Sequence, residues 1–133
     1  MTQEDEKLLL IDLCARLPYG VKCRYQHIQY VENGKIIDIN MFGRVNVDGH
    51  IKDICDIKPY LFPLSSMTEE QKKEYNRLKH EVPVCHYEYG DVVEEVELFD
   101  SPESFEYLIE NHFDYHGLIP IGLAIDATDK NIY

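Results

Sequence analysis

The residues Pro18-Tyr19-Gly20 separate two stretches whose apolar side chains follow different spacings. Before this break, apolar residues recur at intervals of three and four, at Leu10, Leu13, Cys14 and Leu17. That spacing is typical of one face of a helix. After the break, apolar residues alternate with polar ones, at Val21, Cys23 and Tyr25. Alternation is typical of a strand with one buried face, so the chain has to combine helix and sheet in an α+β fold.

The first half of the chain reads as one helix followed by an antiparallel meander. Thr2 and Asp5 form a capping pair, which predicts a helix over residues 3–16. Asn33-Gly34 and Asp48-Gly49 have the residues that two-residue hairpin turns need. We therefore expect the first turn to join strands 28–31 and 35–41, within a small bent sheet or barrel-like meander over residues 21–64.

The middle of the chain contains a proline-rich segment and a polar helix. Prolines in residues 59–64 remove backbone donors, so this segment should lie extended and should not form a central strand or a helix. Thr68 and Gln71 form a capping box, which predicts a mostly exposed helix over residues 69–80. The acidic C-terminal half of the chain begins after this helix.

The C-terminal half is predicted to be a hairpin, a helix and a docked tail. Residues 82–89 and 92–99 are rich in β-branched and aromatic side chains and are divided by Gly90-Asp91. Ser101 and Pro102 are typical of a helix start, and Gly117 is the predicted end. That helix should bury Phe105, Leu108, Ile109 and His112. The apolar residues 118–125 should pack on the core as an extended tail.

Length and composition favour a single cytoplasmic domain over residues 1–133. The chain has 133 residues, the size of one ordinary domain, and its longest apolar run is far too short to cross a membrane. The acidic N-terminus does not resemble a signal peptide. Four scattered cysteines favour buried free thiols over disulfides, at Cys14, Cys23, Cys55 and Cys85.

Negative charge is concentrated in the C-terminal half. The net charge is -12, and no Lys or Arg occurs between His80 and Thr128. This distribution argues against nucleic acid as a partner and favours a protein with a basic surface, although a solvated acidic surface is the structural alternative. The residues predicted to contact such a partner are Glu88, Asp91, Glu94, Glu95, Glu97, Glu103, Glu106 and Glu110. The sequence leaves a homo-oligomer open.

A second hypothesis is a pocket for a nucleotide-like small molecule. The chain has ten tyrosines and no tryptophan, and several tyrosines fall in the predicted strands. Tyrosine rings could stack on a base while basic side chains contact phosphate. The residues predicted for this site are Tyr25, Tyr60, Tyr87, Tyr89, Lys22, Arg24 and Arg44. The structural alternative is that these tyrosines close the rim of the core.

A third hypothesis is a metal-dependent enzyme centred on His112, Asp114 and His116. Two histidines four residues apart share a face of a continuing helix and could bind zinc together. The alternative is a helix end with no metal, and no cofactor is assigned. Cys85 and His86 are neighbours in a predicted strand, so their side chains should point to opposite faces and not form a nucleophilic pair. No catalytic residue is assigned, and a binding protein is favoured over an enzyme.

Three segments together resemble a known group of proteins. They are residues 13–23 (LCARLPYGVKC), 57–70 (IKPYLFPLSSMTEE) and 111–119 (NHFDYHGLI). They are similar to short uncharacterised proteins of gut Bacteroidales, their phages and their mobile elements. The resemblance covers the start, middle and end of the chain, and it implies a phage or mobile-element accessory protein. It implies no activity, cofactor or site residue.

Overall fold

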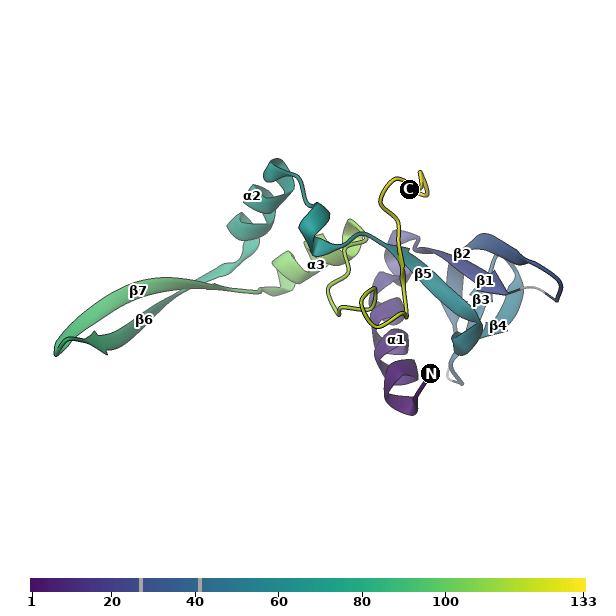
Figure 1. Ribbon diagram of the computed structural model, residues 1–133, viewed down its shortest axis with the longest axis horizontal. Coiled ribbons are helices and arrows are strands. Elements are labelled where there is room, and N and C mark those ends of the chain that lie inside the picture. Colours follow the sequence, from purple (N-terminus) through teal and green to yellow (C-terminus); the bar gives the residue numbers. More distant parts are fainter. Residues whose placement is uncertain (27, 41) are drawn as a thin grey trace. The chain divides into compact units, whose positions relative to one another are not determined.

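The computed structural model describes residues 1–26, 28–40 and 42–133, and its contacts divide the chain into two compact units (Figure 1). Unit 1 consists of Met1–Ser66 and Ile109–Tyr133, and unit 2 consists of Met67–Leu108. The chain contains helices and sheets in both halves, so the predicted α+β class is confirmed. The two units are defined by contacts between residues. Whether they form a single domain over residues 1–133 is not tested by this division, so the single domain stays a prediction.

Unit 1 contains one long helix and a mixed sheet. The helix is α1 (Gln3–Arg16). The sheet has six strands in the described residues, in the order β4-β3-β2-β1-β5-β8. The strands are β1 (Lys22–Gln26), β2 (Val31–Ile39), β3 (Arg44–Val47), β4 (His50–Asp53), β5 (Ile57–Leu61) and β8 (Ile125–Asp126). Short 3-10 turns are η1 (Leu17–Tyr19), η2 (Ile54–Asp56) and η3 (Leu64–Ser66). The meander is antiparallel as expected, whereas β5 and β8 pair in parallel.

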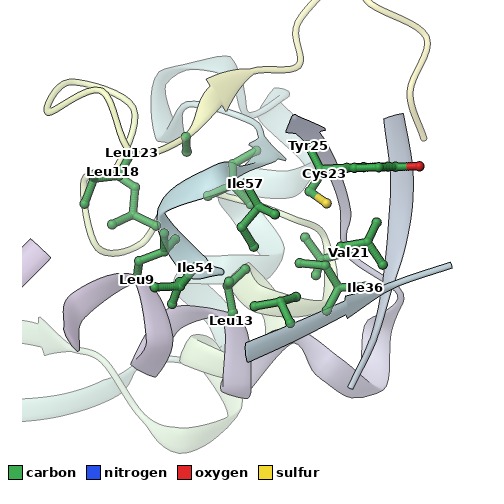
Figure 2. Packing of buried hydrophobic residues seen from close by; sticks show 14 residues of the cluster. Leu9, Leu13, Val21, Cys23, Tyr25, Ile36, Ile54, Ile57, Leu118 and Leu123 are labelled. Carbon is green, nitrogen blue, oxygen red and sulfur yellow. The ribbon is translucent and has the colours of Figure 1, made fainter. Parts of the chain in front are cut away.

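The core of unit 1 lies between α1, the sheet and the C-terminal tail (Figure 2). Leu9 and Leu13 of α1 pack with strand residues such as Ile36, and Leu118 and Leu123 of the tail join the same cluster. Burying one such side chain contributes about 1.5–3 kcal/mol. The predicted docking of the tail on the core is therefore confirmed, but its predicted extended form was wrong, because residues 118–122 form turns in which the Leu123 N–H donates to the Leu118 carbonyl at 2.9 Å.

Helix α1 has the predicted bounds but buries a different face. Its capping box joins Thr2 and Asp5 as expected. The fully buried positions are Leu9, Asp12, Leu13 and Arg16. Of the predicted residues, Leu13 is fully buried and Leu10 and Leu17 are half-buried and pack against the core, so the prediction was wrong only for Cys14, which is exposed. A buried charged pair, described below, occupies the positions that apolar periodicity assigned to solvent.

The turn predicted at Asn33-Gly34 was wrong. Both residues lie inside β2, where Asn33 pairs with Arg24 and Gly34 with Cys23. A Cβ atom on Gly34 would lie 2.7 Å from a methyl group of Val47, so the glycine permits close packing and does not form a turn. The predicted end of the second strand, Met41, lies outside the described residues.

The turn predicted at Asp48-Gly49 is confirmed. These residues join β3 to β4, where Val47 pairs with His50. Both turn residues have positive φ, 50° at Asp48 and 93° at Gly49, as a type I′ turn requires.

The prediction that residues 59–64 avoid a central strand was also wrong. Residues 57–61 form β5, which lies between β1 and β8. Pro59 is tolerated because β8 is short and pairs only with Tyr60 and Leu61. Pro59 pairs with Cys23 on the other side of the strand. The proline thus lies in the part of β5 that has one neighbouring strand.

Unit 2 contains a helix and a long hairpin. Helix α2 (Glu69–Leu78) begins at the predicted capping box of Thr68 and Gln71 and buries no residue. The strands β6 (His80–Glu88) and β7 (Asp91–Phe99) form the predicted hairpin. The turn lies one residue earlier than expected, at Tyr89-Gly90, since Glu88 pairs with Asp91.

Helix α3 (Pro102–Glu110) begins as predicted and ends earlier. The Ser101 hydroxyl accepts the Ser104 N–H at 3.0 Å, which confirms Ser101 as the cap. Gly117 does not end the helix, because the chain leaves helical geometry after Glu110 and His112 adopts a φ of 63°. His112 therefore lies beyond the helix that was expected to bury it.

The cysteines are free, and only one of the four is buried. Cys23 lies in the core, and burial raises the pKa of its thiol to about 12. The exposed thiols are Cys14, Cys55 and Cys85, so the expectation of buried thiols was wrong for these three. Partial desolvation and the neighbouring carboxylates of Asp56 and Asp53 raise the pKa of the Cys55 thiol.

Candidate protein-binding site

The β6–β7 hairpin exposes both of its faces to solvent. Its two strands of nine residues pair only with each other within the part of the chain that the structure describes. The exposed fraction is 99% for Tyr89, 81% for Tyr87, 63% for Val96 and 61% for Val92. A two-stranded hairpin is marginally stable by itself in water. Apolar side chains at such exposed positions are typical of surfaces that bind another molecule.

The pairing of β6 with β7 sorts the side chains onto two different faces. Residues directly opposite each other, such as Pro83 and Val96, share a face, and successive residues alternate. We call one side the apolar face; it consists of Pro83, Cys85, Tyr87, Val92, Val96 and Leu98. Glu81 and Glu94 lie on the same side. The apolar face gathers six exposed side chains of one kind on an element that has no covering layer in its own unit (Figure 1).

We call the opposite side of the hairpin the acidic face. Its carboxylates are Glu88, Asp91, Glu95 and Glu97. Val84, His86 and Val93 lie between them and are half-buried. The only ion pair of the hairpin in the described residues joins His86 Nε2 to Glu88 Oε2 at 3.8 Å. No lysine or arginine of the described residues pairs with a hairpin carboxylate, so the negative charge is available to a partner.

The predicted partner-binding residues therefore divide between two elements. Five lie on the hairpin, at Glu88, Asp91, Glu94, Glu95 and Glu97. Three lie on α3 and are exposed, at Glu103, Glu106 and Glu110. The acidic side chains were identified from the sequence, but the apolar face was not. The apolar face could have been predicted from the alternation of side chains in residues 82–99 together with the register that the turn imposes.

The predicted ligand-binding tyrosines do not surround one pocket within unit 1. Tyr25 points into the core and donates its hydroxyl to Glu32 Oε2 at 2.6 Å, and this bond raises its pKa to about 12. Tyr60 lies on the other face of the sheet and donates to Asn33 Oδ1 at 2.5 Å. Because the two rings lie on opposite faces of one sheet, they cannot stack on the same ligand.

The other residues predicted to bind the ligand belong to other parts of the structure. Tyr87 and Tyr89 belong to the hairpin of unit 2. Arg44 lies on β3 and its Nε is 3.7 Å from Asp53 Oδ1. Lys22 and Arg24 both lie on the outer side of β1 but line different hollows, Arg24 with Tyr25 one of about 330 Å³ and Lys22 one of about 300 Å³.

The predicted metal ligands have other partners. Asp114 is buried and accepts the N–H groups of Leu118 and Ile119 at 2.8 and 2.9 Å. His116 Nδ1 is 2.8 Å from an oxygen of Asp12. The two histidines do not share a helical face, since α3 ends at Glu110. No group of three or more His, Cys, Asp or Glu side chains within residues 1–26, 28–40 and 42–133 is placed to hold a metal ion.

These residues instead complete a buried charged network that the sequence did not reveal. Arg16 and Asp12 are fully buried, and Arg16 Nε donates to Asp12 Oδ1 at 2.6 Å while Nη2 donates to Oδ2 at 3.1 Å. Arg16 Nη2 also donates to the Phe113 carbonyl at 2.6 Å. A forked pair of this kind fixes both side chains. The network joins α1 to the segment that contains all three predicted metal ligands.

His112 is held neutral beside this network. Its ring stacks on Tyr133, with 3.7 Å between ring centroids. Burial and the positive charges of Arg16 and Lys22 together lower its pKa to about 4, and burial makes the largest contribution. The Nδ1 atom is buried without a hydrogen-bond partner among the described residues. In the described residues, His112, Asp114 and His116 therefore have separate environments and do not converge on one point.

Comparisons with known proteins do not add a family. No protein-family model, curated protein or solved structure matched the chain. In the described residues, none of the helices combines the length and the apolar character that spanning a membrane requires.

Proposed function

We propose that this protein is a non-catalytic protein-binding module and that the β6–β7 hairpin is its binding element. The observation that carries the proposal is the apolar face, whose six side chains are exposed on a hairpin that lacks a third strand. Covering this face removes apolar surface from water at about 25 cal/mol per Å². An exposed patch of this kind is retained in a folded protein when another molecule covers it.

The charge around the apolar face defines the partner. Glu81 and Glu94 lie on the same side as the apolar side chains, and the acidic face lies behind them. A partner with an apolar contact surface surrounded by lysines and arginines fits this distribution, whereas an acidic partner or a nucleic acid would be repelled. The resemblance to phage and mobile-element proteins favours a host protein in the cytoplasm as the partner, bound so as to inhibit it.

The experiment that tests the proposal is affinity capture from a Bacteroidales lysate, followed by titration of the purified partner. The full chain is compared with the variant Tyr87→Ser/Val96→Thr, which removes the centre of the apolar face. The matched control is Ile37→Thr/Ile51→Thr, because those two exposed side chains lie on strands of unit 1. We expect the hairpin variant to bind at least about tenfold more weakly and the control to bind normally.

The charge contribution is tested separately by Glu94→Lys. We expect this variant to slow association and to reduce the dependence of affinity on salt.

Normal binding by the Tyr87→Ser/Val96→Thr variant, with its fold verified by circular dichroism, would refute the hairpin as the binding element.

A further inference from the structure

The outer side of the sheet in unit 1 carries a cluster of basic side chains. We call it the basic face; it consists of Lys22 and Arg24 of β1, Lys35 of β2 and Lys58 of β5. All four are exposed. Cys23 and Tyr25, which alternate with the basic residues along β1, are buried in the core. The four cations therefore point away from the core on one side of three adjacent strands.

The strand register places these cations directly opposite one another. Lys22 pairs with Lys35, and Arg24 pairs with Lys58. Like charges at directly opposed positions destabilise a sheet. In the described residues, Arg24, Lys35 and Lys58 form no ion pair, and Lys22 Nζ donates to the carbonyl of Ile132 at 2.8 Å. The sheet thus keeps two unfavourable pairs that an anionic partner would relieve.

The basic face is also hollowed beside both pairs. A hollow of about 330 Å³ is lined by Arg24 and Lys58, and another of about 300 Å³ is lined by Lys22 and Lys35. Each hollow contains one carboxylate, from Asp56 in the first and Asp48 in the second. Asp48 already accepts the backbone N–H of Lys35 at 3.2 Å. Two cations against one carboxylate leave each hollow positive and able to receive further acidic side chains.

The acidic face of the hairpin has the complementary imbalance. Glu88 lies directly opposite Asp91, which is a like-charge pair of the other sign, and Glu95 and Glu97 follow on the same side. The acidic face thus presents four carboxylates where the basic face presents four cations. Every copy of the chain supplies this exposed acidic strand pair, so the local charge complementarity of the two faces points to a second copy as the partner.

We propose that the acidic face of one copy docks on the basic face of a second copy, and that the reciprocal contact closes a dimer. The inference shares the hairpin with the proposed function but uses its other side, so the apolar face stays free for the partner. Each contact places acidic side chains over the Arg24–Lys58 pair and the Lys22–Lys35 pair. Charge complementarity then sets the orientation of the two copies.

The first test is the mass of the full chain in solution, measured by sedimentation velocity and light scattering at 50 and 500 mM NaCl. We expect a dimer at low salt that weakens at least about tenfold at high salt, because exposed charge pairs are screened. A monomer at both salt concentrations would overturn the inference. A dimer that strengthens with salt would do the same, because it would indicate pairing of apolar faces.

The second test is charge exchange. Arg24→Glu/Lys58→Glu and Glu95→Lys/Glu97→Lys should each be monomeric, since each places like charges across both contacts. Their equimolar mixture should dimerise at low salt, because one contact is then native and the other is reversed at both sides. The matched controls are Lys7→Glu/Lys73→Glu and Glu4→Lys/Glu103→Lys, which change net charge equally at exposed positions away from both faces.

These outcomes separate the dimer from the proposed partner. If the exchanged variants, folded by circular dichroism, stay apart when mixed, the reciprocal contact is wrong. If the chain is monomeric yet still captures a partner through the apolar face, only the dimer is rejected. If the dimer forms and no partner binds the apolar face, only the proposed function fails.

Discussion

The two units are stabilised by different kinds of interaction. In unit 1, α1, the six-stranded sheet and the tail share one buried cluster around residues such as Leu13, Ile36 and Leu118. In unit 2, α2 and both strands of the hairpin bury no residue, and their order comes from a capping box, a turn and strand pairing. The difference shows how one chain can combine a packed scaffold with an element whose side chains remain available for binding.

The difference also has an energetic meaning. Local interactions such as a cap contribute about 1 kcal/mol each, whereas a buried leucine contributes about twice as much. Elements with few buried contacts open at lower free energy than the core. The hairpin is therefore expected to exchange its amide hydrogens sooner than β1 and β5, unless a partner or a second copy covers it.

The sharpest contrast between the units is in their arginine–carboxylate pairs. Arg16→Met leaves the buried Asp12 carboxylate without its arginine and in contact only with His116 Nδ1, and we expect it to reduce the free energy of unfolding by about 3–5 kcal/mol. Arg77→Met removes an exposed pair with Glu74 in α2 and should leave the free energy of unfolding almost unchanged, because water screens the two charges. Urea denaturation of both variants measures the difference. Equal effects would mean that the buried network does not stabilise unit 1.

A leucine pair gives the next largest contrast. Leu118 is fully buried in the core of unit 1, and Leu118→Ala should cost about 2–5 kcal/mol because it leaves a cavity. Leu98 on the apolar face is 44% exposed, and Leu98→Ala should cost less than about 1 kcal/mol. Thermal and urea unfolding of the two variants provides the comparison. A large loss from Leu98→Ala would place that side chain in a packed contact.

Substitutions at two glycines distinguish destabilisation by a steric clash from destabilisation by backbone strain. Gly34→Ala places a Cβ 2.7 Å from Val47 and 2.8 Å from Asp48 Oδ2, so it should cost roughly 1–3 kcal/mol. Gly90 has open space around it and a φ of 85°, so Gly90→Ala should cost about 1 kcal/mol through backbone strain alone. Denaturant midpoints test the order. If Gly34→Ala cost less than Gly90→Ala, β2 and β3 would have to move apart to accommodate the alanine methyl group at position 34.

The smallest expected effect is the pH dependence from His112. Its pKa is about 4 when folded and near 6.5 when unfolded, so the unfolded state binds more protons between these values. The stability due to neutral His112 is complete above about pH 6.5 and is lost as the pH falls to about 4, by about 1–2 kcal/mol after allowing for partial exposure. His112→Phe keeps an aromatic ring and should remove this component. Identical pH slopes for the two proteins would contradict the assignment.

Local signals in the sequence predicted local structure well. The caps at Thr2 and Thr68, the turn at Asp48-Gly49 and the hairpin in 82–99 all depend on residues that are near one another in the chain. Each has its own hydrogen-bonding pattern or φ preference, so neighbouring residues were sufficient to find it. The acidic residues of the candidate site were also identified from one continuous stretch of sequence, because no Lys or Arg occurs between His80 and Thr128.

The errors arose where distant residues determine the structure. Gly34 reads as a turn residue until Val47 packs against it, and Pro59 reads as a break until the short β8 pairs beside it. Arg16 is buried where Asp12 and the Phe113 carbonyl accept hydrogen bonds from its Nε and Nη2 atoms, although its Nη1 atom has no partner among the described residues. The basic face depends on the register of three strands, and the register was not predictable once the Asn33-Gly34 turn was misplaced.

The hydrogen bond from Arg16 to the Phe113 carbonyl spans 97 positions of the chain, and it affects the order of events during synthesis. Unit 2 is one continuous segment, whereas unit 1 is interrupted by it, so all of unit 2 is translated before unit 1 is complete. Within the first helix Arg16 can pair with Asp12, but its second acceptor is absent until Phe113 has been translated. A nascent chain therefore presents its hairpin to the cell before its scaffold is closed.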